Sequence, residues 1–188
     1  MQRNEIIAKV ISKIFFPHLS LVYTLITYMF FSAPKNLIVT IATIVIFYYL
    51  APSLILILHS KKLGKTISEM TGRERLPIII SGAIFYLIAY FIFLTFRELS
   101  MAKITLFLLV FTTVFGLFSI FSKPSFHVCA FAGGIVFLAL LFDLRIIILL
   151  ILTPLIGWSR VVLRAHTRNQ VILGAILGVS LSIIFSRI

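Results

Sequence analysis

The feature that most constrains this chain is a series of apolar runs, separated by short polar connections, that are about as long as a lipid bilayer is thick. A membrane-spanning helix needs about 20 mainly apolar residues, and fewer when its neighbours bury it. We therefore predict six or seven transmembrane helices. The candidate runs cover approximately residues 17–31, 36–58, 76–96, 104–121, 126–142, 144–157 and 169–186.

Composition supports a membrane protein over a soluble one. Of the 188 residues, 61% are apolar and 12% are charged, and the mean hydropathy is +1.19. A soluble domain is about half apolar and about a quarter charged. The β-branched runs, such as 146–151, could also suggest strands, but a membrane barrel needs alternating polarity and these runs are apolar throughout. We predict an all-α polytopic membrane helix bundle that forms a single membrane domain over residues 1–188.

The charge is strongly basic, with 17 Lys and Arg against five acidic residues and a formal net charge of +12. In a soluble protein this excess would suggest nucleic-acid binding. Here the cations are scattered between apolar runs and form no basic helix face with interleaved aromatics. Cations in such positions contact lipid headgroups or orient a protein in the bilayer. Membrane lipids are therefore the expected partners, and nucleic acid is excluded.

The N-terminal segment superficially resembles a signal peptide, because Arg3, Lys9 and Lys13 precede an apolar run. No small-residue cleavage site follows, and further hydrophobic segments come after it. We predict that the segment is retained and that it begins with an amphipathic stretch. The apolar side chains of that stretch are Ile6, Ile7, Val10, Ile11 and Ile14.

Two prolines carry local predictions. Pro52 lies inside the second apolar run, where a proline kinks a helix. Pro77 follows the basic connection 59–75 and is a plausible first residue of the third helix.

Counting crossings predicts which polar segments share a membrane face. The N-terminus and the segments 59–75, 122–126 and 158–169 fall on one face, provided that the short sixth run crosses completely. That face carries twelve of the Lys and Arg residues and the opposite face carries five. The excess predicts that the first face is cytoplasmic.

The first polar constellation is the turn 122–127 at the start of the fifth run. A cation (Lys123), a hydroxyl (Ser125) and an imidazole (His127) lie there within five residues. The N–H groups at the start of a helix favour anions, so this combination is typical of an anion site. The alternative is a basic interfacial turn with a serine cap and a lysine that reaches the headgroups.

The second constellation is the segment 159–170, which has three arginines and a histidine between two apolar runs. Polar groups are costly there unless they are solvated or functional. If the helix begins near His166, Gln170 lies at i+4 on the same face. Its side-chain carbonyl could then accept a hydrogen bond from the imidazole and orient the ring. The alternative is a cytoplasmic basic loop.

Together, the two segments resemble the type-2 phosphatidic acid phosphatase superfamily, which are integral membrane lipid phosphate phosphatases related to vanadium haloperoxidases. The family's last motif is Ser-Arg, five residues, His, three residues, Asp. Ser159-Arg160 and His166 have this spacing, with Gln170 in place of the Asp. The family's middle motif, Pro-Ser-Gly-His, is similar to Pro124-Ser125-Phe126-His127. The resemblance covers about residues 120–180.

The family's first motif, Lys, six residues, Arg-Pro, has no proper match in this chain. Lys123 could supply its cation, and Arg73 and Arg75 in the sequence Arg73-Glu74-Arg75-Leu76-Pro77 are possible additional cations. The segment 59–77 looks like a feature of a divergent bacterial branch, which implies a multi-pass protein of the bacterial plasma membrane. Bacterial relatives commonly act from the outer side of that membrane, which conflicts with the charge count, so the side stays open.

The resemblance also implies roles for individual residues. His166 would be the nucleophile that forms a phosphohistidine, and His127 would protonate the leaving alkoxide. Phosphoryl transfer needs positioning and positive charge, so cations and hydroxyls would bind the non-bridging oxygens. Those phosphate-binding residues would be Lys123, Ser125, Ser159 and Arg160. No metal or other cofactor is required, and the sparse acids form no evident carboxylate cage.

Gln170 is the main departure from the family pattern. A carboxylate both orients a histidine and stabilises the imidazolium, whereas an amide only orients the ring. In the serine-protease triad the corresponding change lowers the rate by about 10⁴.

The expected function is hydrolysis of a lipid phosphomonoester or diphosphate, of the phosphatidate, phosphatidylglycerophosphate or polyprenyl diphosphate class. Two other functions fit the same basic segments. One is a non-catalytic protein that binds or flips anionic lipid, and the other is a lipid phosphotransferase. Two glycine pairs, Gly133-Gly134 and Gly174 with Gly178, are expected to allow close helix packing.

Overall fold

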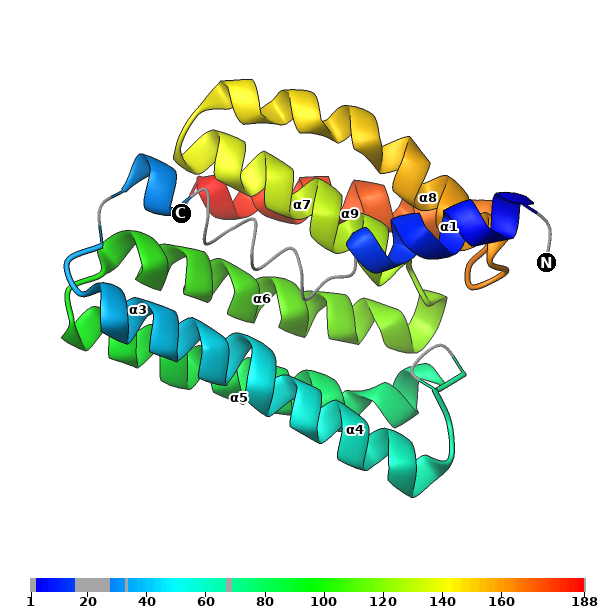
Figure 1. The fold of residues 1–188 in the computed structure, drawn as a ribbon, viewed down its shortest axis with the longest axis horizontal. Helices are drawn as coiled ribbons and strands as arrows, with labels where there is room; N and C mark the ends of the chain where they lie inside the picture. The colour runs from blue at the N-terminus through cyan, green and yellow to red at the C-terminus, as the bar shows by residue number, and fades with distance from the viewer. Residues whose placement is uncertain (1–2, 16–27, 33, 67–68, 188) are drawn as a thin grey trace. The chain divides into compact units, whose positions relative to one another are not determined.

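The computed structural model describes residues 3–15, 28–32, 34–66 and 69–187. Regular structure in these ranges is helical and includes no strand, which confirms the predicted all-α class (Figure 1). The helical elements are α1 (Arg3–Ile14), α3 (Leu37–Thr43), η1 (Ile44–Leu50), α4 (Ala51–Leu63), α5 (Gly72–Thr95), α6 (Leu99–Ser122), α7 (Phe126–Leu141), η2 (Leu144–Leu152), α8 (Thr153–Val162) and α9 (Arg168–Ser186).

Five helices of the described residues are long and apolar enough to cross a bilayer, which makes the chain a polytopic helical membrane protein. They are Leu37–Leu63, Gly72–Thr95, Leu99–Ser122, Leu144–Val162 and Arg168–Ser186. A sixth apolar helix, α7, has 16 residues. These six correspond to the last six predicted runs. The first predicted run, 17–31, lies outside the described residues except for its last four, which are helical.

The chain divides into two compact units. We call Met1–Thr27 with Ser122–Ile188 the motif unit, because it holds both polar constellations, and Tyr28–Phe121 the central unit. The single membrane domain expected from the sequence stays a prediction.

In the central unit, the helical geometry changes directly before Pro52. The segment η1 is a π-helix, and Ala51 N donates its hydrogen bond to Ile46 O, five residues earlier. Proline has no N–H and its ring crowds the carbonyl four residues before it, so a regular α-helix cannot continue through it unchanged. Wider turns are a common response to such a disruption. The structure thus has a π-helical segment directly before Pro52, and the predicted kink stays a prediction.

The predicted start of the third spanning helix at Pro77 is wrong. Helix α5 begins at Gly72, and a reciprocal cap fixes that start: Glu74 N donates to Thr71 Oγ1 (3.3 Å) and Thr71 N donates to Glu74 Oε2 (2.7 Å). This capping box satisfies two N–H groups that would otherwise lack partners. Pro77 lies in the second turn, where the helix is already established.

A buried carboxylate holds the connections of the central unit together. Glu98 is 3% exposed, and it accepts hydrogen bonds from Tyr28 Oη (2.7 Å) and from Asn36 N (2.6 Å). A carboxylate in an apolar environment is stable when both oxygens have donors. This role was not predictable from the sequence, because Glu98 lies in the short connection between two predicted spanning helices.

In the motif unit, α7 and α9 run in the same direction (Figure 1). The segments η2 and α8 connect them in the sequence and run in the opposite direction. A 3₁₀ segment rises about 2.0 Å per residue and an α-helix about 1.5 Å, so η2 with α8 reaches about 33 Å. The hydrocarbon core of a bilayer is about 30 Å thick. The sixth run is therefore long enough for the complete crossing on which the predicted topology depends.

A local ion pair closes the turn between α7 and η2. Asp143 accepts hydrogen bonds from Arg145 N (2.8 Å) and from the Arg145 guanidinium. These contacts hold the pKa of the Asp143 carboxyl below its usual range. The sequence Asp143-Leu144-Arg145 thus ends the apolar helix with a charged turn.

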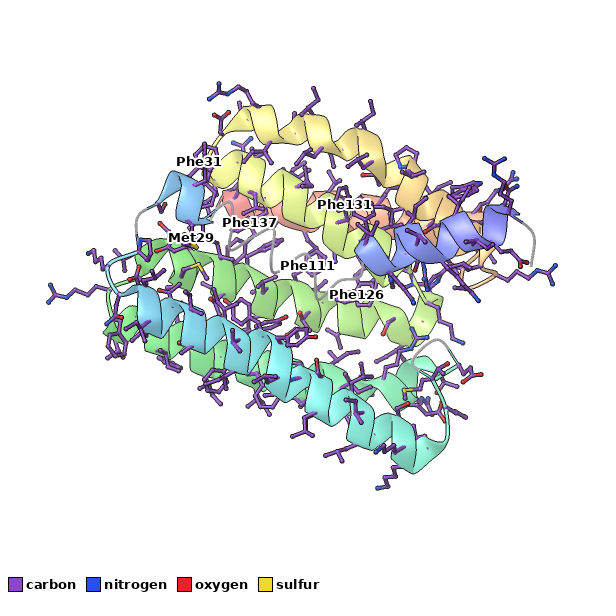
Figure 2. All side chains as sticks on the ribbon, viewed as in Figure 1. Met29, Phe31, Phe111, Phe126, Phe131 and Phe137 are labelled. Carbon is purple, nitrogen blue, oxygen red and sulfur yellow. The ribbon has the colours of Figure 1, made fainter. Side chains whose placement is uncertain are left out.

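Aromatic side chains pack the motif unit along α7. Phe131 meets Phe15 edge to face, with ring centroids 5.3 Å apart, and Phe137 meets Phe185 of α9 at 5.8 Å. Phe131 and Phe137 are labelled on α7 in Figure 2. Such pairs contribute beyond their buried area and join the neighbouring helices to α7.

Helices α7 and α9 are in main-chain contact, which confirms the expected role of two glycines. A Cβ atom added at Gly174 would lie 2.7 Å from Ser125 O. One added at Gly178 would overlap Cys129 O and lie 3.0 Å from Gly133 N. Small residues at a helix interface permit this approach. Ser182 Oγ continues the contact by donating to Gly133 O (2.6 Å).

We predict that Gly178→Ala destabilises the protein by about 1–3 kcal/mol, the range typical of an over-packed contact. The added methyl meets main-chain atoms of α7, which no side-chain rotation can relieve. Thermal unfolding in detergent, followed by circular dichroism, measures the change. Gly134→Ala is the matched control, because a Cβ at Gly134 would have no neighbour within 4 Å among the described residues. Equal melting temperatures for the two variants would contradict the packing argument.

Candidate functional site

Three helix ends of the motif unit meet: the start of α7, the end of α8 and the start of α9 (Figure 1). Ser125 N donates to Gln170 O at 2.9 Å, which joins the first of these ends to the third. The two polar constellations, which are more than 30 residues apart in the sequence, are therefore adjacent in space. The predicted topology, with 122–126 and 158–169 on one face, agrees with this arrangement.

The turn after α8 explains the spacing between Arg160 and His166. Arg160 O accepts hydrogen bonds from Ala165 N (3.0 Å) and His166 N (3.3 Å), and Arg164 N donates to Val161 O (2.9 Å). Arg164 has a left-handed conformation (φ 54°). This is the Schellman arrangement that commonly ends α-helices. It returns the backbone of His166 to the level of Arg160, so five intervening residues bring the two together.

The Ser125 side chain is a buried hydroxyl that does not cap its helix. It is fully buried, and its side chain forms no cap on α7 although it occupies the N-cap position. Within the described ranges, its Oγ atom has no hydrogen-bond partner. Buried polar atoms nearly always have partners, and an exception calls for an explanation such as a ligand site. The hydroxyl is thus available to an anion at the start of α7.

Arg160 is a partly buried cation in the same region. Its Nη1 atom donates to Ser12 Oγ of α1 at 2.5 Å. Its Nε atom is buried and has no partner in the part of the chain that the structure describes. The ion pairs found there are Lys65–Glu74 and Arg145–Asp143, so no described carboxylate balances Arg160. A guanidinium in this setting is well suited to bind an anion.

The two predicted catalytic histidines lie at the starts of α7 and α9. His127 lies in the first turn of α7, and His166 directly precedes Thr167, the N-cap residue of α9. Both are partly buried, and the Nε2 atom of His127 and the Nδ1 atom of His166 are shielded from solvent. Each imidazole thus belongs to one of the helix starts that Ser125 N and Gln170 O join.

The geometric premise for Gln170 is wrong. Helix α9 begins at Arg168, so His166 precedes the helix and the i, i+4 relation does not apply. Gln170 and Thr167 form a capping box: Thr167 N donates to Gln170 Oε1 (3.1 Å) and Gln170 N donates to Thr167 Oγ1 (3.3 Å). The carbonyl oxygen expected on the imidazole therefore accepts a backbone N–H instead. The local capping motif explains why glutamine suits this position.

Two other predicted phosphate ligands differ in their surroundings. Ser159 is fully buried in α8, and its hydroxyl donates to Ile156 O at 2.7 Å, so that hydrogen is not available to a ligand. The role of Ser159 as a phosphate ligand stays a prediction. Lys123 is exposed in the turn before α7 and has a left-handed backbone (φ 46°). Its role as a phosphate ligand stays a prediction.

The additional cations predicted from the sequence lie in the central unit, at the start of α5. Arg73 is exposed there and Arg75 is partly buried. Their contribution to an anion site stays a prediction.

The fold and the three adjacent helix ends identify the class of protein. It is a polytopic helical membrane protein with basic, hydroxyl and imidazole side chains at one end of its C-terminal helices. The family model of the PAP2 superfamily matches residues 112–188. The matched residues include all of α7, α8 and α9. The match confirms the family resemblance seen in the two motifs. No curated protein and no solved structure matches the chain.

Sequence reasoning missed Ser12 as a neighbour of this site. The amphipathic pattern of the N-terminal stretch predicts a role only for its apolar side chains. The available signal was the pair of small residues Ala8 and Ser12, one helical turn apart, which are both buried against α8.

Proposed function

We propose that this protein is a lipid phosphate phosphatase that hydrolyses a lipid phosphomonoester or diphosphate through a phosphohistidine. The substrate classes are phosphatidate, phosphatidylglycerophosphate and polyprenyl diphosphate. The proposed location is the bacterial plasma membrane. The single observation that carries the proposal is the pair of buried, unused donors, Ser125 Oγ and Arg160 Nε, in the residues that the PAP2 family model matches.

In the proposed first step, an imidazole nitrogen of His166 attacks phosphorus and the bond from phosphorus to the leaving oxygen breaks. The leaving oxygen is the ester oxygen of a monoester or the bridging oxygen of a diphosphate. His127, in its protonated form, gives its proton to that oxygen. Arg160, Ser125 and Lys123 bind the non-bridging oxygens, where charge must be neutralised during phosphoryl transfer.

In the second step, water attacks the phosphohistidine and the bond from phosphorus to nitrogen breaks. His127 accepts a proton from the attacking water, so the histidine pair is restored. The products are the lipid alcohol and inorganic phosphate, or the lipid monophosphate and inorganic phosphate from a diphosphate. All proton transfers use residues of this chain.

The electrostatic setting favours an anionic substrate. Arg160 has no described carboxylate to balance it, and the starts of α7 and α9 contribute helix N-termini. Helix N-termini attract phosphate because their N–H groups point outward and the helix dipole is positive there. A membrane-bound site of this kind can bind the headgroup while the hydrocarbon tail stays in the lipid.

The test is release of inorganic phosphate by the full-length protein, purified in detergent, from one lipid of each proposed class. We expect release from at least one class, and the same rate after treatment with a chelator. Arg187→Ala, an exposed cation at the far end of α9, is the control and should not change the rate. Binding of these lipids without any release would favour the non-catalytic lipid-binding function. Transfer of phosphate to an added lipid alcohol would favour a phosphotransferase.

A further inference from the structure

The N-terminal helix α1 contributes a side chain to the candidate site. Ser12 is 8% exposed, and its Oγ atom accepts the hydrogen bond from Arg160 Nη1 at 2.5 Å. These residues are 148 positions apart in the sequence. Ala8, one turn earlier, is fully buried, so the two small residues allow α1 to approach α8 closely.

The rest of α1 suits a helix at the membrane surface. Its large apolar side chains are exposed at Ile6, Ile7, Val10 and Ile14, and its cations are exposed at Arg3, Lys9 and Lys13. An amphipathic helix with basic residues lies in the headgroup region of a bilayer. Ser12, which contacts Arg160, therefore belongs to a helix that is suited to the membrane interface.

The hydrogen bond selects which edge of the guanidinium remains available. Arginine binds phosphate best through two parallel N–H groups, and the edge formed by Nε and one terminal nitrogen can provide them. Ser12 engages Nη1, while the buried Nε atom has no partner in the described residues. A serine hydroxyl carries no charge, so it orients the cation without neutralising it.

On the basis of the proposed phosphatase function, we infer that Ser12 is a positioning residue, which holds the Arg160 guanidinium so that its Nε edge binds the substrate phosphate. The hydroxyl accepts from Arg160 and does not itself contact the substrate. Its loss leaves the cation in place but free to rotate about its last side-chain torsions. The contact also makes α1 a part of the site.

Ser12→Ala tests this inference in the full-length protein. A hydrogen bond to a charged group is typically worth at least about a tenfold change in an equilibrium. We expect kcat/KM for the lipid phosphate to fall about tenfold, and the inhibition constant for orthovanadate, a phosphate analogue, to rise in parallel. Ser12→Thr, which keeps the hydroxyl, should restore both values.

Two controls separate positioning from packing. Ser182→Ala removes another buried hydroxyl of the motif unit, which donates to Gly133 O and Gly178 O, so it should lower stability without changing orthovanadate inhibition. In an Arg160→Ala background, Ser12→Ala should have no additional effect on kcat/KM, because interacting residues are not additive.

The outcomes distinguish this inference from the proposed function. If the wild-type protein releases no phosphate and orthovanadate does not raise its melting temperature, the proposed function fails and the inference falls with it. If the wild-type protein is active and Ser12→Ala matches it in kcat/KM and in orthovanadate inhibition, the inference alone is wrong. Equal losses in Ser12→Ala and Ser12→Thr would also overturn it, in favour of a packing role.

Discussion

Replacing His166 with alanine should lower kcat for phosphate release by at least about 10⁴-fold, the scale observed when an enzyme loses its covalent nucleophile. No phosphohistidine can form without the imidazole, and the neighbouring hydroxyl and guanidinium can still bind phosphate. We therefore expect the loss in kcat while orthovanadate still raises the melting temperature. Phosphate release under substrate saturation and thermal unfolding with orthovanadate give the two measurements.

Asn169→Ala is the matched control for His166→Ala. Asn169 is an exposed polar residue in the first turn of α9, three positions after His166, and it has no role in the proposed mechanism. Its replacement should leave kcat unchanged. Phosphate release by His166→Ala at a rate close to wild type would rule out this histidine as the nucleophile, whatever the effect on stability.

Replacing His127 with alanine should give a loss that depends on the leaving group. A positioned general acid contributes about 10²–10⁴-fold to a rate. An alkoxide is a poor leaving group that needs the proton, so hydrolysis of the lipid phosphate should slow by that factor. A nitrophenolate leaves readily without protonation, so hydrolysis of nitrophenyl phosphate should slow by less than about tenfold.

The ratio of the two rates identifies the role of His127. In His166→Ala both substrates should lose activity together, because both need the nucleophile. Equal losses for the lipid and the nitrophenyl ester in His127→Ala would contradict the role as general acid and would indicate a general effect on binding or folding. Circular dichroism of the same preparations tests whether the variant is folded.

The spanning helices were predictable from the sequence because hydrophobicity over about 20 residues is a strong signal. Their ends were not, because local side-chain bonds decide them. Thr71 and Glu74 start α5 before Pro77, and Thr167 and Gln170 start α9 after His166. In both cases the box of reciprocal bonds was present in the sequence as a threonine followed three residues later by an acid or an amide.

The candidate site was predictable as two motifs but not as a set of contacts. Their spacing indicated Ser125, Arg160 and His166, and the helix order predicted that they share a face. The contact between Ser12 and Arg160 spans almost the whole chain and carries no local pattern. The hydrogen bond from Ser159 Oγ to Ile156 O was also not predictable, because a serine in a helix can point to a ligand or bond to the backbone of its own helix.

The shortness of α7 has a consequence for where the chemistry takes place. Its 16 residues extend about 24 Å, less than the roughly 30 Å of hydrocarbon in a bilayer. Asp143 and Arg145 form a charged pair beyond its far end, and a charged pair favours water over hydrocarbon. With that pair in water, the opposite end, with Ser125 and His127, would stop several ångströms below the level of the headgroups. A lipid ester would reach such a depth by sinking slightly between helices, without leaving the leaflet in which it diffuses.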